Sequence, residues 1–375
     1  MYRVVKNKIN RSGGFSILEM MVAMAVLMVL LVVLIQVTGR VGEIWRMGSG
    51  KITAFQNARS AFTTINRTLS QATLNTYNDY VDSDEKYRTD ANRSSFVPAK
   101  FMRASELHFI SGPAVGLVKG ATAADNPGDA IFFQAAMGST DTPTLNGLQT
   151  AMNSTGFYIQ YGDMPDSLLP AWLKTLFASK DKKFRLIQVI SPTEDFEVYN
   201  STSSPNYDID WLTTLTDTPT AAASKQRILA EDVCLLVVRT RLSPEDEELI
   251  GPKVGMTLSD STQGSILAPN YTYDSRAWET GYGGGVSNNR KNIMRNQIPP
   301  IVDVAMVCLD PRTTQRVEWG SAPPAAVAVP PGLFTNSANM EADLETYASE
   351  LTDAGLQFRI FRSSVKLQGA KWSNF

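Results

Sequence analysis

The chain opens with a basic leader and a long apolar segment, and this segment limits how the rest can fold. From Phe15 to Val37, only Ser16, Glu19 and Gln36 are polar among 23 residues. As an α-helix the segment would be about 35 Å long, which is enough to cross the roughly 30 Å hydrocarbon layer of a bilayer. We therefore expect one transmembrane helix over residues 15–37.

The leader predicts the orientation of that helix. It contains four basic residues and no acidic residue. Positive charge before a first span keeps the N-terminus in the cytoplasm and sends the C-terminal domain across the membrane. A removable signal peptide has a shorter apolar core of about 7 to 15 residues and a cleavage site of the A-x-A kind, and no such site follows Val37. The sequence thus favours a retained anchor.

Glu19 is the feature of this segment that needs a physical reason. A carboxylate costs roughly 2.5 to 3.5 kcal/mol at the centre of a bilayer and less near an interface. Glu19 follows Phe15 by four residues, so both lie on one helical face. Cleavage between Gly14 and Phe15 would create an α-amine that could neutralise Glu19, in the same chain or in a neighbour. The alternative is a signal anchor in which Glu19 reaches the headgroups.

These residues carry a family resemblance. A basic leader ending in Gly14, then Phe15, then Glu19 at the fifth mature position of an apolar helix resembles a type IV prepilin or a type II secretion pseudopilin. The resemblance implies that a prepilin peptidase cleaves after Gly14 and methylates Phe15. It also implies that Glu19 pairs with the amine of an adjacent subunit, and that other pilin-like subunits and an inner-membrane assembly platform are partners.

The remaining chain predicts one large domain after the anchor. We expect a leader at 1–14, a transmembrane helix at 15–37, an amphipathic helical extension at 38–74 and a globular domain at 75–375. The apolar residues of the extension recur at helical spacings: Phe55, Phe62, Ile65, Leu69 and Ala72. Arg59 and Arg67 lie off this stripe, so we expect them in solvent, where one of them could contact a neighbouring subunit.

The sequence of the domain predicts many β-strands. Short segments with many β-branched or aromatic residues end at turn formers, and residues 75–100 read as an exposed loop. The predicted strands are 107–110, 130–134, 157–161, 184–190, 233–240, 301–309 and 358–367. The predicted fold class is α+β, with the long N-terminal helix packed on an antiparallel sheet that has long loops.

Later segments extend the resemblance. Residues 227–241 and 297–309 are similar to the late paired strands of the minor pseudopilin called J. The tail, residues 358–375, resembles the prepilin-like group called Verru_Chthon cassette protein C. Between these strands, apolar residues at 340, 344, 347 and 351 predict a helix that stops at Gly355 and covers the sheet, and the proline-rich residues 322–332 before it predict an extended surface connector.

Residues that could carry chemistry are few. His108 is the only histidine, and no serine or cysteine stands in a recognisable nucleophile motif, so we expect a structural or surface histidine. Cys234 and Cys308 are the only cysteines, and two buried thiols are favoured over a disulfide. The acidic residues at 245–248 and at 208 and 210 lack an EF-hand spacing and predict surface turns. We expect no metal and no cofactor.

Taken together, these features predict a non-enzymatic, single-pass protein of the inner membrane with a periplasmic domain. A charged fraction of 19% and a net charge of −2 exclude a nucleic-acid footprint, so membrane lipid and protein subunits are the expected partners. A domain with long loops suits a minor or tip subunit of a pseudopilus or pilus-like filament. The alternative is a signal-anchored periplasmic binding or enzymatic domain outside any filament.

Overall fold

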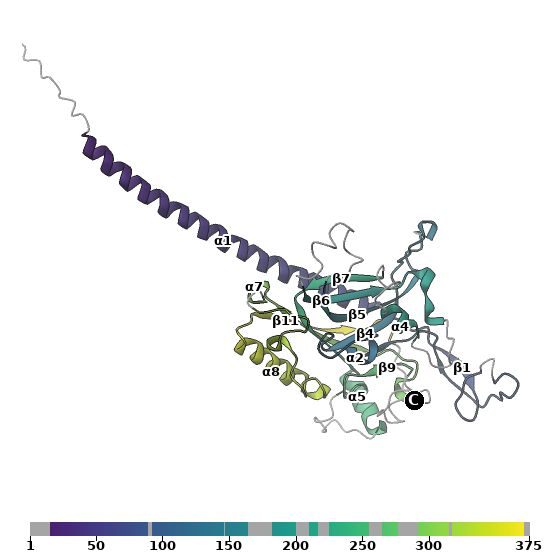
Figure 1. The fold of residues 1–375 in the computed structure, drawn as a ribbon. Helices are drawn as coiled ribbons and strands as arrows, with labels where there is room; N and C mark the ends of the chain where they lie inside the picture. Colours follow the sequence, from purple (N-terminus) through teal and green to yellow (C-terminus); the bar gives the residue numbers. More distant parts are fainter. Residues whose placement is uncertain are drawn as a thin grey trace, which may run out of the picture. The chain divides into compact units, whose positions relative to one another are not determined.

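A computed structural model describes most of the chain (Figure 1). The described residues are 16–88, 92–145, 147–163, 182–199, 210–216, 225–254, 265–276, 292–314 and 317–370. The chain divides into two compact units, Met1–Ile52 and Thr53–Phe375. Helix α1 (Ile17–Ser70) contributes residues to both units, and every described strand lies in the second unit.

The second part of α1, residues 53–70, is amphipathic and packs on the domain. Phe62, Ile65 and Leu69 are buried, which confirms the predicted stripe. The ring of Phe62 lies 5.8 Å from that of Phe361. After the helix ends, the amide of Thr73 donates to the carbonyl of Gln134 at 3.0 Å and so ties the chain to a central strand.

A six-stranded antiparallel sheet forms the larger layer, in the order β7-β6-β5-β4-β3-β9. Its strands are β3 (Ile110–Pro113), β4 (Asp129–Ala136), β5 (Met152–Gly162), β6 (Lys183–Ile190), β7 (Gln226–Glu231) and β9 (Tyr273–Asp274). β4, β5 and β6 are buried along almost their full length, so side chains on both faces are covered. The antiparallel sheet predicted from the sequence is confirmed.

A second antiparallel sheet has the order β11-β10-β8. Its strands are β8 (Val233–Arg241), β10 (Ile301–Leu309) and β11 (Phe358–Lys366), so the predicted pairing of the late strands is confirmed. Asp303 on the middle strand accepts hydrogen bonds from Arg239, Arg241 and Ser364. Burial opposes ionisation of Asp303, but these hydrogen bonds outweigh it and hold the pKa of the carboxyl below its usual value.

Two short segments join the sheets. Asp232 separates β7 from β8 at a φ of +58°, and its backbone bonds to Phe184 in one sheet and to Leu309 in the other. Gly128 adopts a φ of +81°, and a Cβ atom there would lie 2.1 Å from the carbonyl oxygen of Leu236. Only glycine therefore permits this approach, which places the next residue, Asp129, between the sheets.

The region predicted as a loop at 75–100 contains an ordered arm, so that prediction is wrong in part. β1 (Tyr77–Val81) pairs with β2 (Lys100–Ala104) to form a separate two-stranded sheet. The arm is labelled at β1 in Figure 1. The arm lacks a regular alternation of polar and apolar residues, because charged and aromatic residues share its faces. Tyr80 and Phe101 are cross-strand partners with ring centroids 4.2 Å apart.

Helix α8 (Met340–Asp353) matches its prediction closely. It buries Met340, Leu344, Tyr347 and Leu351, and Gly355 follows with a φ of +73°. The proline-rich residues 322–332 before it were predicted as a surface connector. This is wrong at η7 (Ala325–Val327), because Val327 is buried and its carbonyl accepts a 2.8 Å bond from the hydroxyl of Tyr347.

Two further predictions need correction. The strand predicted at 107–110 begins only at Ile110, and the acidic run 245–248 lies in helix α5 (Pro244–Ile250) rather than in a turn. Ser243 caps that helix by accepting a bond from the amide of Asp246.

The other short helices of the described residues are α2 (Ala114–Leu117), α4 (Asp210–Thr216), α7 (Pro311–Thr314), η1 (Pro143–Leu145), η3 (Thr193–Asp195), η4 (Glu197–Tyr199), η6 (Gly251–Val254) and η8 (Ser337–Asn339).

Candidate assembly site at the start of helix α1

The predicted processing residues Gly14 and Phe15 lie outside the described residues, and the described chain begins one residue later. Ser16 stands before α1, and its Oγ accepts a 3.2 Å hydrogen bond from the amide of Glu19. This contact is one half of a capping box, in which a serine caps the helix amide three residues on. The S-x-x-E spacing was available in the sequence, but the cap had not been predicted from it.

Glu19 is therefore a first-turn residue of α1 as well as an acid in an apolar segment. Negative charge is favourable there, because the helix macrodipole places partial positive charge at the N-terminus. The side chain is exposed, and no described residue forms an ion pair or a side-chain hydrogen bond with its carboxylate. The helix start thus favours a negative charge at Glu19, whose side chain is exposed.

The segment around Glu19 is exposed throughout. Ile17–Gly42 is the one helical stretch among the described residues that is long and apolar enough to cross a membrane. At 26 residues it would span about 39 Å. Its side chains are uncovered in this structure, with Ile17 at 83% and Met28 at 69% exposure. A contiguous apolar surface of this size requires a bilayer or neighbouring helices.

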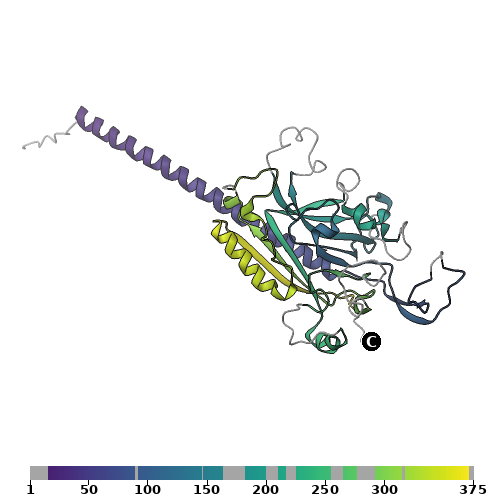
Figure 2. The same cartoon turned by 60° about the horizontal axis from the view of Figure 1, so that its bottom comes forward.

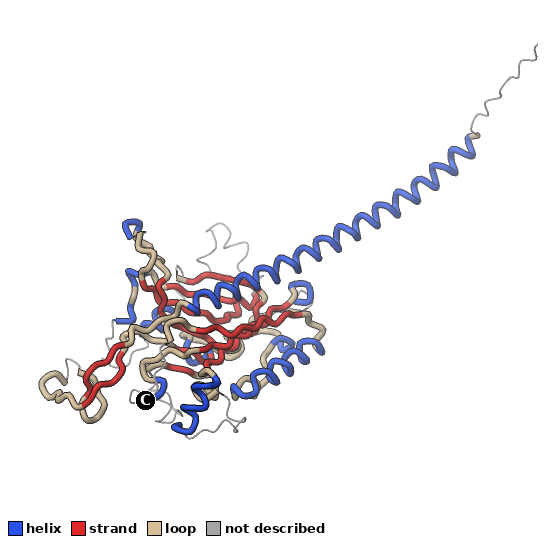
Figure 3. The backbone as a smooth tube through the Cα atoms, turned by 180° about the vertical axis from the view of Figure 1, so that it is seen from behind, coloured by secondary structure: helices blue, strands red, loops and turns tan. Residues whose placement is uncertain are grey.

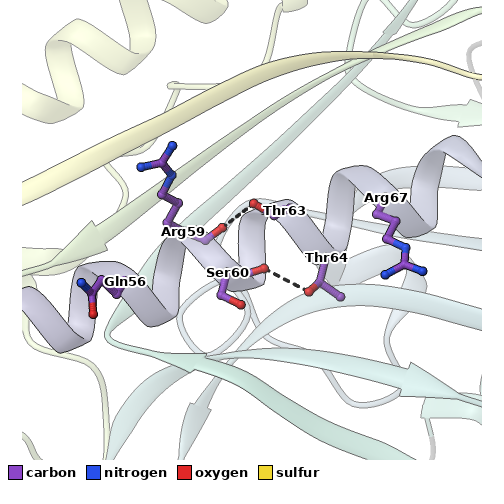
Figure 4. Close-up of a pocket in the computed structure, with 6 residues that line it drawn as sticks. All are labelled: Gln56, Arg59, Ser60, Thr63, Thr64 and Arg67. Atoms are coloured by element: carbon purple, nitrogen blue, oxygen red, sulfur yellow. Dashed lines mark hydrogen bonds between the residues drawn. The ribbon is translucent and has the colours of Figure 1, made fainter.

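Further along α1, the polar face forms a shallow groove of about 390 Å³ (Figure 4). It is lined by Gln56, Arg59, Ser60, Thr63, Thr64 and Arg67. Arg59 and Arg67 are exposed, as the apolar stripe predicted, and neither meets a carboxylate among the described residues. The groove residues other than the two arginines had not been singled out from the sequence, because nothing local distinguishes a free polar face from an ordinary one.

His108 is buried and structural. Its Nε2 lies 2.7 Å from Oδ1 of Asp274, and the indole of Trp211 donates to its Nδ1 at 3.3 Å. The indole can only donate, so Nδ1 accepts and Nε2 carries the proton that is donated to Asp274. Burial lowers the pKa of His108, which favours this neutral form. With both ring nitrogens engaged, neither is placed to activate a nucleophile.

The two partners of His108 come from distant parts of the chain. Asp274 is 166 residues away, and Trp211 is 103 residues away on α4. Neither residue had been predicted to contact the histidine, and no local pattern in the sequence connects them.

Cys234 and Cys308 are buried free thiols, as favoured from the sequence. Burial raises the pKa of Cys234 to about 12 and that of Cys308 still further. Both therefore stay protonated and weakly reactive at neutral pH. Within the described part of the chain, no group of three or more histidine, cysteine or acidic side chains is arranged to hold a metal ion. Asp208 of the acidic pair lies outside that part, and Asp210 begins α4.

Comparison with known proteins locates one matching segment. Residues 9–35 match the family described as the prokaryotic N-terminal methylation motif. This match spans the end of the leader, the Gly14–Phe15 junction, Glu19 and most of the apolar segment. Neither the search of curated proteins nor the search of solved structures found a match, so the resemblance to pseudopilin J and to the Verru_Chthon group gains no support. The chain therefore carries a prokaryotic N-terminal methylation motif ahead of an α+β domain.

Proposed function

We propose that this protein is a membrane-anchored subunit of a pilin-like filament, cleaved after Gly14, methylated on Phe15 and assembled through Glu19. The observation that carries the proposal is the state of Glu19. Its carboxylate has no partner among the described residues and lies in a helical segment whose apolar side chains are all exposed. The matched motif at 9–35 supports the processing step.

The proposed chemistry is charge neutralisation during insertion. An α-amine has a pKa near 7.7 to 8.0, so a newly freed amine is largely protonated at neutral pH. Pairing it with Glu19 of a neighbouring subunit removes two isolated charges from an apolar environment. An unpaired charge in that environment is costly, so the pair favours the subunit that is correctly placed along the filament axis.

We place the domain in the periplasm and assign the chain to the minor subunits of a type II secretion pseudopilus or a similar filament. The basic leader supports this orientation. We also propose that the protein is not an enzyme. In support, His108 has both ring nitrogens engaged and the two thiols are buried and protonated.

The test uses the full chain in its native membrane with two copies that carry different tags. The Glu19→Ala variant should still insert into the membrane. The amount of other pilin-like subunits that co-isolates with its tagged copies should fall at least tenfold. Glu19→Asp, which keeps the charge, is the matched control and should retain part of the co-isolation. Unchanged co-isolation of Glu19→Ala would show that the carboxylate has no pairing role.

A second candidate is a signal-anchored periplasmic binding domain, and the arm β1–β2 favours it. Tyr77, Tyr80, Val97 and Phe101 are exposed there, and exposed aromatic side chains are typical of binding surfaces. Deleting the aromatic pair with Tyr80→Ser and Phe101→Ser distinguishes the two functions. A filament subunit should still assemble with these changes. A solitary binding protein should lose its ligand when they are made, and neither the natural protein nor the variant should assemble with other subunits.

A further inference from the structure

We propose that the groove on α1 receives helix α8 from a second copy of the same chain. The contact is separate from the one assigned to Glu19. It depends on the proposed function only in that both require two copies to meet. Three features of the molecule support the contact: the shape of the groove, the positive charge at its two ends, and a matching exposed row of side chains on α8.

The groove has the form that accepts a helix. Its lining residues fall into two rows with steps of four, one at 56, 60 and 64 and the other at 59, 63 and 67. Rows of this spacing form ridges on a helix surface, and the space between two ridges takes a ridge of another helix. The centre holds only Ser60, Thr63 and Thr64, so a partner backbone can approach closely. Figure 4 shows the longer side chains of Arg59 and Arg67 on opposite sides of this centre.

Two hydroxyl groups at the centre of the groove already donate hydrogen bonds within α1. The hydroxyls of Thr63 and Thr64 donate to the carbonyls of Arg59 and Ser60, at 2.9 and 3.0 Å. The floor therefore carries no unsatisfied hydroxyl proton at these two positions. Residues 53–70 contain two arginines and no acidic residue, so the groove is positive at both ends.

Several other arginines of the domain have carboxylate partners within the chain. Arg239 and Arg241 pair with Asp303, Arg295 pairs with Glu85, and Arg362 pairs with Glu341. Arg59 and Arg67 have no such carboxylate among the described residues. An exposed pair of arginines without internal partners, on either side of a helix-sized groove, indicates an external acidic helix.

Helix α8 has the complementary surface. It contains five acidic residues and no lysine or arginine. Four exposed residues form a ridge with steps of four along it: Glu341, Glu345, Ser349 and Asp353. Glu341 is held by Arg362, while Glu345 and Asp353 have no partner among the described residues. Glu345 and Asp353 are eight residues apart, as are Arg59 and Arg67, which corresponds to about 12 Å along each helix.

Within one chain the groove and the ridge face away from the shared core. α1 packs inward through Phe62 and Ile65, and α8 packs inward through Leu344 and Tyr347. Tyr347 reaches Cys234 on β8, whereas Phe62 meets Phe361 on β11. The smaller sheet therefore contacts both helices, and Figure 3 shows strands between them. Figure 2 shows α8 in yellow along the domain surface, where a second copy can reach it.

A contact between two different surfaces of identical chains is heterologous. Such a contact joins two copies through different faces and leaves one face of each copy free for another subunit. Because the charges are exposed, the contact should weaken with salt, since the Debye length is about 8 Å at 0.15 M and about 3 Å at 1 M.

The test is thiol cross-linking between full-length chains in their native membrane. One tagged copy carries Thr63→Cys and another carries Ser349→Cys, and a short bifunctional maleimide joins the two. The natural cysteines are buried and should not react. We expect a cross-linked pair that contains both tags, at least fivefold above the yield of either variant expressed alone, and reduced at 1 M salt.

Charge reversal gives the decisive controls. Arg59→Glu with Arg67→Glu in the first copy should lower the yield at least fivefold, and Glu345→Arg with Asp353→Arg in the second copy should restore it. Arg93→Glu with Arg227→Glu, at exposed arginines outside the groove, should leave the yield unchanged. Any of three results would overturn the inference: no mixed pair, cross-links only between two Thr63→Cys copies, or cross-links only to a different protein.

The same cross-link separates this inference from the proposed function. If the mixed pair persists in Glu19→Ala copies, the groove contact forms without Glu19, and the pairing role of Glu19 is then decided by co-isolation with the other pilin-like subunits alone. If the copies co-isolate through Glu19 but give no mixed pair, the groove contact alone is wrong.

Discussion

The two parts of helix α1 have the same backbone and opposite surroundings. In Ile17–Gly42 every side chain is exposed and nearly all are apolar, whereas residues 53–70 bury one stripe and expose a polar face. The second part is therefore recognised in the sequence by the helical spacing of its apolar residues. The first part is recognised only by its length and its apolar composition. A segment that is apolar on every side gives no direction to packing and needs a surrounding apolar medium.

The same contrast governs the acids of the two regions. Glu19 in the first part is held at a helix start with no partner for its carboxylate among the described residues. Asp129 in the domain is buried between the sheets, where Oδ2 accepts a 2.8 Å bond from the amide of Val238. Burial raises the pKa of Asp129 to about 7, despite that bond. On the proposed function, Glu19 is neutralised by a charge from another subunit, whereas Asp129 can be neutralised by binding a proton.

The largest expected effect concerns Asp129. The folded state binds its proton up to about pH 7 and the unfolded state only to about pH 4, so stability falls as pH rises between these values. Three pH units correspond to about 4 kcal/mol as an upper bound. Asp129→Asn should remove this dependence. Urea unfolding of both forms from pH 4 to 8 measures it, and an identical pH slope in the two proteins would contradict the assignment.

The next effect compares the two parts of α1 directly. Ile65→Ala removes a side chain that is 1% exposed, and we expect a loss of about 3 kcal/mol in the unfolding free energy of the domain. Leu31→Ala removes one that is 51% exposed and should leave the domain unchanged. Guanidinium unfolding of the full chain in detergent, followed by tryptophan fluorescence, checks both. Equal losses would show that the two parts are not energetically distinct.

His108 should have a smaller effect on stability, and its pH dependence should be opposite to that of Asp129: stability should fall as the pH is lowered. Its pKa is lowered in the folded state, so its contribution is present above pH 6.5 and is lost as pH falls below that value. His108→Gln can keep a hydrogen bond to Asp274 without titrating, and it should flatten the loss between pH 6.5 and 5. Thermal melts at these two values test this. The interpretation fails if the variant loses stability on acidification as steeply as the natural protein.

Prediction from sequence succeeded where a pattern was local and repeated. The bounds of β10 and the buried residues of α8 follow from periods of two and of three to four. It failed where one residue interrupts a pattern, as Asp232 does by dividing 227–241 into two strands that belong to different sheets. It also failed for contacts between distant residues, such as those of His108.

The candidate site shows the same division. Glu19 was predicted because one acid in an apolar run is conspicuous, and the processing residues were predicted by resemblance. The polar groove of α1 required the structure, since only the packed domain shows which face of the helix remains open. The acidic ridge of α8 likewise became evident only when the buried face had been identified.

The most direct test of the whole account is the mass of the N-terminal peptide from the protein purified from its native membrane. We expect a chain that begins at Phe15 with one methyl group on its amine. A chain that retains Met1, or any residue of the leader through Gly14, would contradict it, because Glu19 would then lack the amine that is proposed to neutralise it.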